Sequence, residues 1–193
     1  MGKLSALVSD FDDTLFFNRP ALISAAKDLY ENLLKGKGED YKILNDLEII
    51  IGEGKVPKGF DKKWKNELYT SAYVKYRDKL LPNLPFINYL KEIVKQGNEL
   101  IILSARGEEF REQTEEMLNK YGLNYSSVIL PANHELKDEE WKMLEVKKLS
   151  ETYNHIVLFE DKEENIHHII NNLKSENVEF YLVDHSILTY ITH

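Results

Sequence analysis

The segment Leu4-Ser5-Ala6-Leu7-Val8-Ser9-Asp10-Phe11-Asp12-Asp13-Thr14-Leu15 joins a short apolar run to a group of carboxylates. The apolar run predicts a buried strand, and Asp10 and Asp12 follow where it ends. Ligands of open α/β sheets bind at this edge. Burying several anions together is costly unless a cation, usually Mg²⁺, is held among them. The pattern indicates a metal-assisted site with a nucleophilic carboxylate, and the alternative is a solvated turn that closes the strand.

The composition is that of an ordinary globular protein. The chain has 193 residues, enough for one substantial domain or for a core domain with a small insertion. The formal net charge is −8, so a general electrostatic attraction to nucleic acid is not expected. Cysteine is absent, which excludes disulfides, thiolate metal sites and cysteine nucleophiles. The apolar stretch at the N-terminus is too short for a signal peptide, and no segment reaches transmembrane length. We therefore expect a cytoplasmic protein without a membrane partner.

From Phe86 onward, helical and strand patterns alternate regularly. The patterns predict strands at 99–103, 127–130, 155–159 and 178–183, and helices at 86–95, 108–121, 138–151 and 163–174. Such alternation predicts an α/β fold with a Rossmann-like parallel sheet, right-handed crossovers and helices on both faces.

Residues 17–81 lack this alternation and are patterned as helices instead. Apolar positions predict helices over 21–35, 41–51 and 61–80, and Gly36-Lys37-Gly38 ends the first of them. We therefore expect a core domain of residues 1–16 and 82–193, with a small helical insertion of residues 17–81.

Polar residues follow two later strands. The strand at 99–103 is followed by Ser104-Ala105-Arg106, and the strand at 155–159 by Glu160-Asp161. Lys142 lies between them on a predicted helix, 19 positions before Asp161. A strand-end aspartate pair, a strand-end serine, a lysine and a second strand-end acid, in this order, resemble the four motifs of the haloacid dehalogenase-like superfamily. The resemblance covers the whole alternating core.

The resemblance implies a role for each motif residue. Asp10 would be the nucleophile that becomes an aspartyl phosphate. Asp12 would be the general acid that protonates the leaving oxygen and then the base that activates water. Ser104 and Lys142 would hold the phosphoryl oxygens, and Arg106 is a further candidate for substrate binding.

The resemblance also implies a magnesium site. Its ligands would be the Asp10 carboxylate, the backbone carbonyl of Asp12 and the Asp161 carboxylate. The fourth motif departs from the common pattern, because Glu160 is longer than aspartate and Asn165 replaces a frequent second acid. A contribution of Glu160 and Asn165 to the metal site stays open.

Two assignments have alternatives among neighbouring residues. Lys137, Lys147 and Lys148 lie close to Lys142 in the sequence, and each is a candidate for the same phosphate contact. Arg106 either reaches a substrate anion or pairs with the glutamates at 108 and 109.

The function implied is a Mg²⁺-dependent phosphomonoester hydrolase of the phosphatase branch. Asp12 favours this chemistry because an alkoxide leaving group gains from a proton donor. The insertion lies where relatives carry a cap, and a covered site favours a small phosphorylated metabolite or nucleotide. One alternative is a nucleic-acid end (polynucleotide) phosphatase. Ser104-Ala105-Arg106 resembles the Ser/Thr-x-Arg motif of such enzymes. The other is a non-catalytic phosphate-binding protein of the same fold.

Overall fold

The computed structural model describes residues 5–35, 40–133, 135–184 and 187–191. Leu4 and the predicted helix end at 36–38 lie outside these residues. The chain divides into two compact units: an α/β unit of Met1–Phe16 with Pro82–His193, and a helical unit of Phe17–Leu81. Among the described helices, none is both long and apolar enough to cross a membrane.

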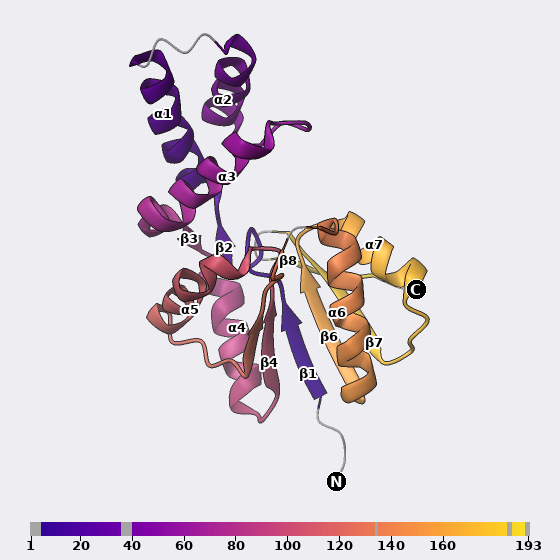
Figure 1. The fold of residues 1–193 in the computed structure, drawn as a ribbon. Helices are drawn as coiled ribbons and strands as arrows, with labels where there is room; N and C mark the ends of the chain where they lie inside the picture. Colours follow the sequence, from indigo (N-terminus) through magenta and orange to yellow (C-terminus); the bar gives the residue numbers. More distant parts are fainter. Residues whose placement is uncertain (1–4, 36–39, 134, 185–186, 192–193) are drawn as a thin grey trace. The chain divides into compact units, whose positions relative to one another are not determined.

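A six-stranded sheet with the order β5-β4-β1-β6-β7-β8 forms the centre of the α/β unit (Figure 1). Its strands are β1 (Ser5–Ser9), β4 (Glu99–Leu103), β5 (Ser127–Ile129), β6 (His155–Glu160), β7 (Val178–Asp184) and β8 (Ile187–Ile191). All neighbouring strands are parallel except β8, which runs antiparallel to β7. Since β1 lies between β4 and β6, the residues that follow these three strands meet at one edge of the sheet.

Helices cover both faces of this sheet. The α-helices in the described part of this unit are α4 (Leu84–Lys95), α5 (Arg111–Lys120), α6 (Asp138–Thr152) and α7 (Glu163–Asn172). On one face, Val146 of α6 and Ile166 of α7 belong to a buried cluster with Val8 and Leu158. On the other, the Phe86 ring of α4 lies 5.2 Å from that of Phe159. Alternate residues of β6 thus enter two hydrophobic layers, which anchors the strand that precedes Asp161.

The α/β fold predicted from the alternation is confirmed, with one difference at its end. The strand predicted over 178–183 is not the last, because β8 follows it as an antiparallel edge strand. The residues of β8 are exposed or half-buried. Four of its five residues are apolar, but they do not alternate with polar residues in the way that marks a half-buried strand, so periodicity did not predict it.

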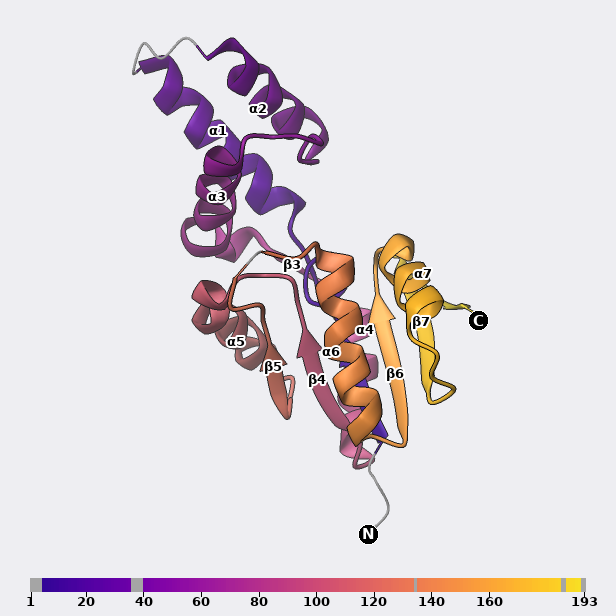
Figure 2. The same cartoon turned by 45° about the vertical axis from the view of Figure 1, so that its right-hand side comes forward.

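The helical unit contains α1 (Arg19–Lys35), α2 (Tyr41–Glu53) and α3 (Lys62–Thr70). The first two lie side by side (Figures 1 and 2), and apolar residues of both, together with Leu68 of α3, are buried. A π-helical turn (Ser71–Lys75) and a 3₁₀ turn (Arg77–Lys79) follow α3, so the helix predicted over 61–80 is irregular in its second half. The short strands β2 (Phe16–Phe17) and β3 (Leu81–Pro82) pair where the chain enters and leaves the unit.

Candidate active site

The loop after β1 places Asp10 at the carboxyl edge of the sheet. Its backbone N–H donates to the carbonyl of Phe159 on β6 at 2.9 Å, so the chain stays attached to the neighbouring strand. Asp13 has a φ of 60°, a left-handed conformation that aspartate adopts more readily than most residues. The Asp13 N–H donates to the carbonyl of Phe16 at 2.8 Å, which closes a tight loop. Asp10 and Asp12 are therefore held on a short loop with fixed backbone contacts.

Lys142 of α6 lies between two buried carboxylates. Its Nζ donates to Asp10 Oδ1 at 2.8 Å and to Glu160 Oε2 at 2.6 Å. The second oxygen of Asp10 lies 3.4 Å from the Thr14 hydroxyl, and Glu160 Oε1 accepts from Asn165 Nδ2 at 3.0 Å. All five residues are buried. The network fixes the direction of the Asp10 carboxylate and links α6 to the ends of β1 and β6.

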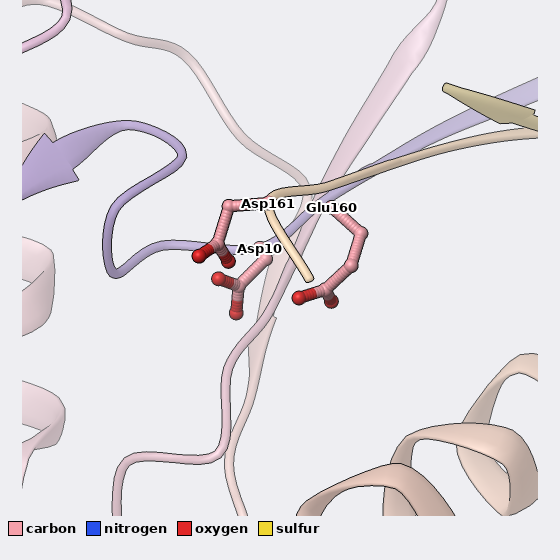
Figure 3. Close-up of side chains that lie close together, drawn as sticks. All are labelled: Asp10, Glu160 and Asp161. Carbon is pink, nitrogen blue, oxygen red and sulfur yellow. The ribbon is translucent and has the colours of Figure 1, made fainter. Parts of the chain in front are cut away.

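Asp161 completes a group of three acids. One oxygen from each of Asp10, Glu160 and Asp161 lies within 4.8 Å of the others. The carboxyl groups of Asp10 and Asp161 are neighbours in Figure 3. Asp161 Oδ1 is buried, and among the described residues it has no hydrogen-bond partner. A buried oxygen without a donor beside other carboxylates suits a cation, and an all-oxygen set suits Mg²⁺.

The three acids carry more negative charge than Lys142 and Lys162 together balance. Burial raises the pKa of Asp10 to about 7, and Lys142 opposes that rise. Burial also raises the pKa of Asp161 to about 9, and the charges of Asp10 and Glu160 add to the effect. Burial would raise the pKa of Glu160 as well, but Lys142 holds it below its usual value. A divalent cation beside Asp10 and Asp161 would favour their ionised forms and reverse the rise.

Asp12 is bound by Arg106 through both carboxylate oxygens. Arg106 Nε and Nη2 donate to Asp12 Oδ2 and Oδ1, each at 2.7 Å. Nη1 lies 3.4 Å from the Thr114 hydroxyl oxygen, and the guanidinium lies 4.2 Å from the Phe11 ring centroid. The Arg106 side chain is 1% exposed, whereas that of Asp12 is 20% exposed. Arg106 thus orients Asp12, and its role in substrate binding stays a prediction.

Ser104 lies at the end of β4, beside the strand that carries Asp10. It is buried, its N–H donates to the Ile129 carbonyl of β5 at 3.2 Å, and its Oγ accepts the Arg106 N–H at 3.3 Å. Ser9, the residue before Asp10, is in register with Ile102 of β4. Ser104 and Asp10 therefore follow adjacent strands at the same edge, and a contact of Ser104 with phosphate stays a prediction.

The structure shows where the alternative residues lie. Lys137, Lys147 and Lys148 are exposed, whereas Lys142 is buried against Asp10. The phosphate contact of Lys142 stays a prediction. The glutamate at 108 forms a salt bridge with Arg111, whereas the Arg106 guanidinium donates hydrogen bonds to Asp12.

Besides the Lys142–Asp10 and Arg106–Asp12 pairs, further contacts of the site were not predicted from the sequence. Thr14 lies within the first motif and contacts Asp10, so the motif itself held that signal. Glu160 accepts a hydrogen bond from Lys142 on one carboxylate oxygen and one from Asn165, five residues later, on the other. Thr114 reaches Arg106 from the middle of α5, and no sequence pattern indicated it.

Solved structures share this architecture. A haloacid dehalogenase family IA hydrolase from Entamoeba histolytica is 18% identical, with a TM-score of 0.59, and the match covers 95% of the present chain and 86% of the other. A Bacteroides fragilis protein described as a haloacid dehalogenase-like hydrolase is 16% identical, with a TM-score of 0.63 and coverage of 97% and 90%. A chain of the Pnkp1/Rnl/Hen1 RNA repair complex is 21% identical, with a TM-score of 0.54. That match covers 93% of the present chain but only 42% of the RNA repair protein.

The sequence matches no protein-family model and no curated protein sequence. Structural likeness at these identities shows the fold, and the chemistry is argued from the site itself.

Proposed function

We propose that this chain, whose fold is that of the haloacid dehalogenase-like hydrolases, is a Mg²⁺-dependent phosphomonoester hydrolase that forms an aspartyl phosphate. The observation that carries the proposal is the environment of Asp10. This buried carboxylate is held by Lys142 at 2.8 Å and lies beside a buried Asp161 oxygen that has no hydrogen-bond partner among the described residues. A carboxylate that attacks an anionic phosphate needs a fixed direction and nearby positive charge, and this environment supplies the lysine and the ligands for a cation.

Two displacements at phosphorus make up the proposed reaction. In the first, an Asp10 oxygen bonds to phosphorus, the bond to the ester oxygen breaks, and that oxygen takes a proton from Asp12. In the second, water attacks phosphorus and gives its proton to Asp12 while the bond to Asp10 breaks, which releases inorganic phosphate. Ser104 and Lys142 would bind the phosphoryl oxygens. Lys142 uses two of its three N–H groups on carboxylates, which leaves one for this contact.

Arg106 adds a condition to the acid role of Asp12. Both oxygens of Asp12 accept hydrogen bonds from Arg106, and such an ion pair favours the charged carboxylate. To carry the proton of the first step, Asp12 therefore has to give up at least one of these bonds. The same ion pair orients Asp12 as a base for water in the second step.

The metal would be held by Asp10 and Asp161 together with the backbone carbonyl of Asp12. When bound, Mg²⁺ reduces the repulsion between the attacking carboxylate and the phosphate. Glu160 already accepts hydrogen bonds from Lys142 and Asn165, so we propose that it anchors the lysine.

The helical unit is proposed to be a cap that selects the substrate. Residues Phe17–Leu81 form a separate compact unit, inserted in the sequence between the nucleophile loop and α4. Contacts remote from the reacting atoms contribute to substrate choice, whereas the phosphoryl chemistry belongs to the core.

Hydrolysis of p-nitrophenyl phosphate by the full chain tests the proposal. We expect turnover with Mg²⁺, its loss in EDTA, and its loss in Asp10→Asn, which is nearly isosteric. Asp78→Asn, the same change at an exposed position, is the matched control and should retain full activity. Circular dichroism shows whether each variant is folded. Full activity in EDTA would reject the metal requirement. A folded Asp10→Asn variant that keeps about a tenth of the wild-type kcat would reject Asp10 as the nucleophile.

A further inference from the structure

Basic residues gather in one part of the helical unit. Eight of the chain's 25 lysines and arginines lie between residues 55 and 79, together with three of its 33 acids. This segment has a formal net charge of +5, and the rest of the chain has −13. The overall charge of −8 therefore conceals a cationic segment in an anionic protein, and such segregation favours an anionic partner for that segment.

A group of exposed lysines lies in the loop before α3 and in its first turn. Five lysines lie within residues 55–65, and every one is exposed: Lys55, Lys58, Lys62, Lys63 and Lys65. Among the described residues, no carboxylate forms a salt bridge with any of them. The single acid in this stretch, Asp61, caps α3 instead, because its Oδ1 accepts the backbone N–H groups of Lys63 at 2.9 Å and Trp64 at 3.3 Å. The positive charge of the stretch is therefore available to a ligand.

Aromatic rings lie beside these lysines. Trp64 and Tyr69 of α3 are half-buried, and the Tyr69 ring lies 5.4 Å from that of Tyr73. Lys63 Nζ lies 5.2 Å from the Trp64 ring centroid, and Lys65 Nζ lies 5.9 Å from that of Tyr69. Cations that bind phosphates, placed next to rings on which bases stack, are the combination that binds single-stranded nucleic acid. This combination distinguishes a nucleic acid from other anionic surfaces.

We propose that the lysines of residues 55–65, with Trp64 and Tyr69, form a binding surface for single-stranded nucleic acid. The substrate is then a phosphomonoester at the end of an oligonucleotide. The inference deepens the proposed function and rests on it, because the phosphoryl chemistry is unchanged and only the substrate class is added. Both units belong to one chain, so a strand bound by the helical unit stays at a high local concentration for the Asp10 site.

Three substrates that differ in the number of phosphates test the proposal: an end-phosphorylated ten-residue oligonucleotide, the matching nucleoside monophosphate, and p-nitrophenyl phosphate. For the full chain, kcat/KM on the oligonucleotide should exceed that on the mononucleotide by about tenfold or more at low salt. It should fall as salt rises, because three lysine–phosphate contacts on a single strand give a slope of about −2 in log–log form.

The variant is the triple change Lys62→Ala, Lys63→Ala and Lys65→Ala. Its kcat/KM on the oligonucleotide should fall by about tenfold. The slope of log kcat/KM against log salt concentration should become less negative by about two. Its kcat/KM on p-nitrophenyl phosphate should stay at the wild-type value. The matched control replaces three exposed lysines of the α/β unit, at positions 95, 120 and 147, and should leave both activities unchanged.

Binding is measured separately, by fluorescence anisotropy of the oligonucleotide with the full Asp10→Asn chain, which should not turn it over. Equal kcat/KM on oligonucleotide and mononucleotide, with no effect of the triple change, would overturn the inference and leave the proposed hydrolase intact. Turnover of none of the three substrates would instead reject the hydrolase, and anisotropy then decides the surface alone. Binding to phosphatidylserine vesicles without binding to the oligonucleotide would also overturn it.

Discussion

Binding of Mg²⁺ should displace protons from the acid cluster. In the metal-free protein, Asp161 and Asp10 have pKa values of about 9 and 7. At pH 7, Asp161 is therefore protonated and Asp10 is about half protonated. A carboxylate that binds Mg²⁺ has to lose its proton, so the cation competes with these protons. The apparent affinity for Mg²⁺ should rise with pH in a range where ordinary carboxylates no longer titrate.

The size of the effect follows from these values. Each proton released makes the apparent Kd fall about tenfold per pH unit, or about 1.4 kcal/mol. Asp161 alone then lowers Kd by about 100-fold between pH 6.5 and 8.5. Without metal, the pKa values of Asp10 and Asp161 are higher in the folded than in the unfolded chain. Their contribution to the free energy of unfolding is therefore fully present at low pH. That stability is lost as pH rises through about 7 for Asp10 and about 9 for Asp161.

Isothermal titration calorimetry with Mg²⁺ alone, repeated in two buffers of different ionisation enthalpy, measures both Kd and the protons released. We expect more than one proton per Mg²⁺ at pH 7. Asp161→Asn should weaken binding and remove most of the pH dependence, whereas the exposed control Asp78→Asn should not. Equal Kd values at pH 6.5 and 8.5 would refute the reasoning, and so would wild-type binding by Asp161→Asn.

Arg106→Lys keeps the charge but loses the paired hydrogen bonds of the guanidinium to Asp12. The kcat on p-nitrophenyl phosphate should fall about 10–100-fold with KM nearly constant. A rise in KM alone would instead make Arg106 a substrate contact. Asp12→Asn should slow turnover by about 10²–10⁴-fold, with a smaller loss for dinitrophenyl than for phenyl phosphate; equal losses would contradict the acid role. Lys142→Met should abolish turnover. Because it leaves the buried carboxylates of Asp10 and Glu160 without their cation, it should also lower the free energy of unfolding by about 3–5 kcal/mol in urea titrations. Lys147→Met, at an exposed position of the same helix, should change neither quantity, and a similar loss there would show that α6 tolerates no change.

Much of the α/β unit could be predicted from local pattern. Each buried strand carries its own apolar run, and each helix its own 3.6-residue repeat, so their order implied a parallel sheet. The candidate residues could be located for the same reason, because Asp10, Ser104 and Asp161 each follow a strand. The edge strand β8 was missed although four of its five residues are apolar, because they do not alternate with polar residues.

Only the tertiary structure decided which side chains meet. Lys142 binds Asp10 across 132 positions, and Arg106 binds Asp12 across 94. Sequence motifs predicted that Lys142 and Arg106 contact substrate, and the folded chain shows that each also binds an aspartate of the first loop. Periodicity depends on the burial of each segment and can be read locally. The partner of a buried charge depends on which donor lies within about 3 Å once all elements are packed.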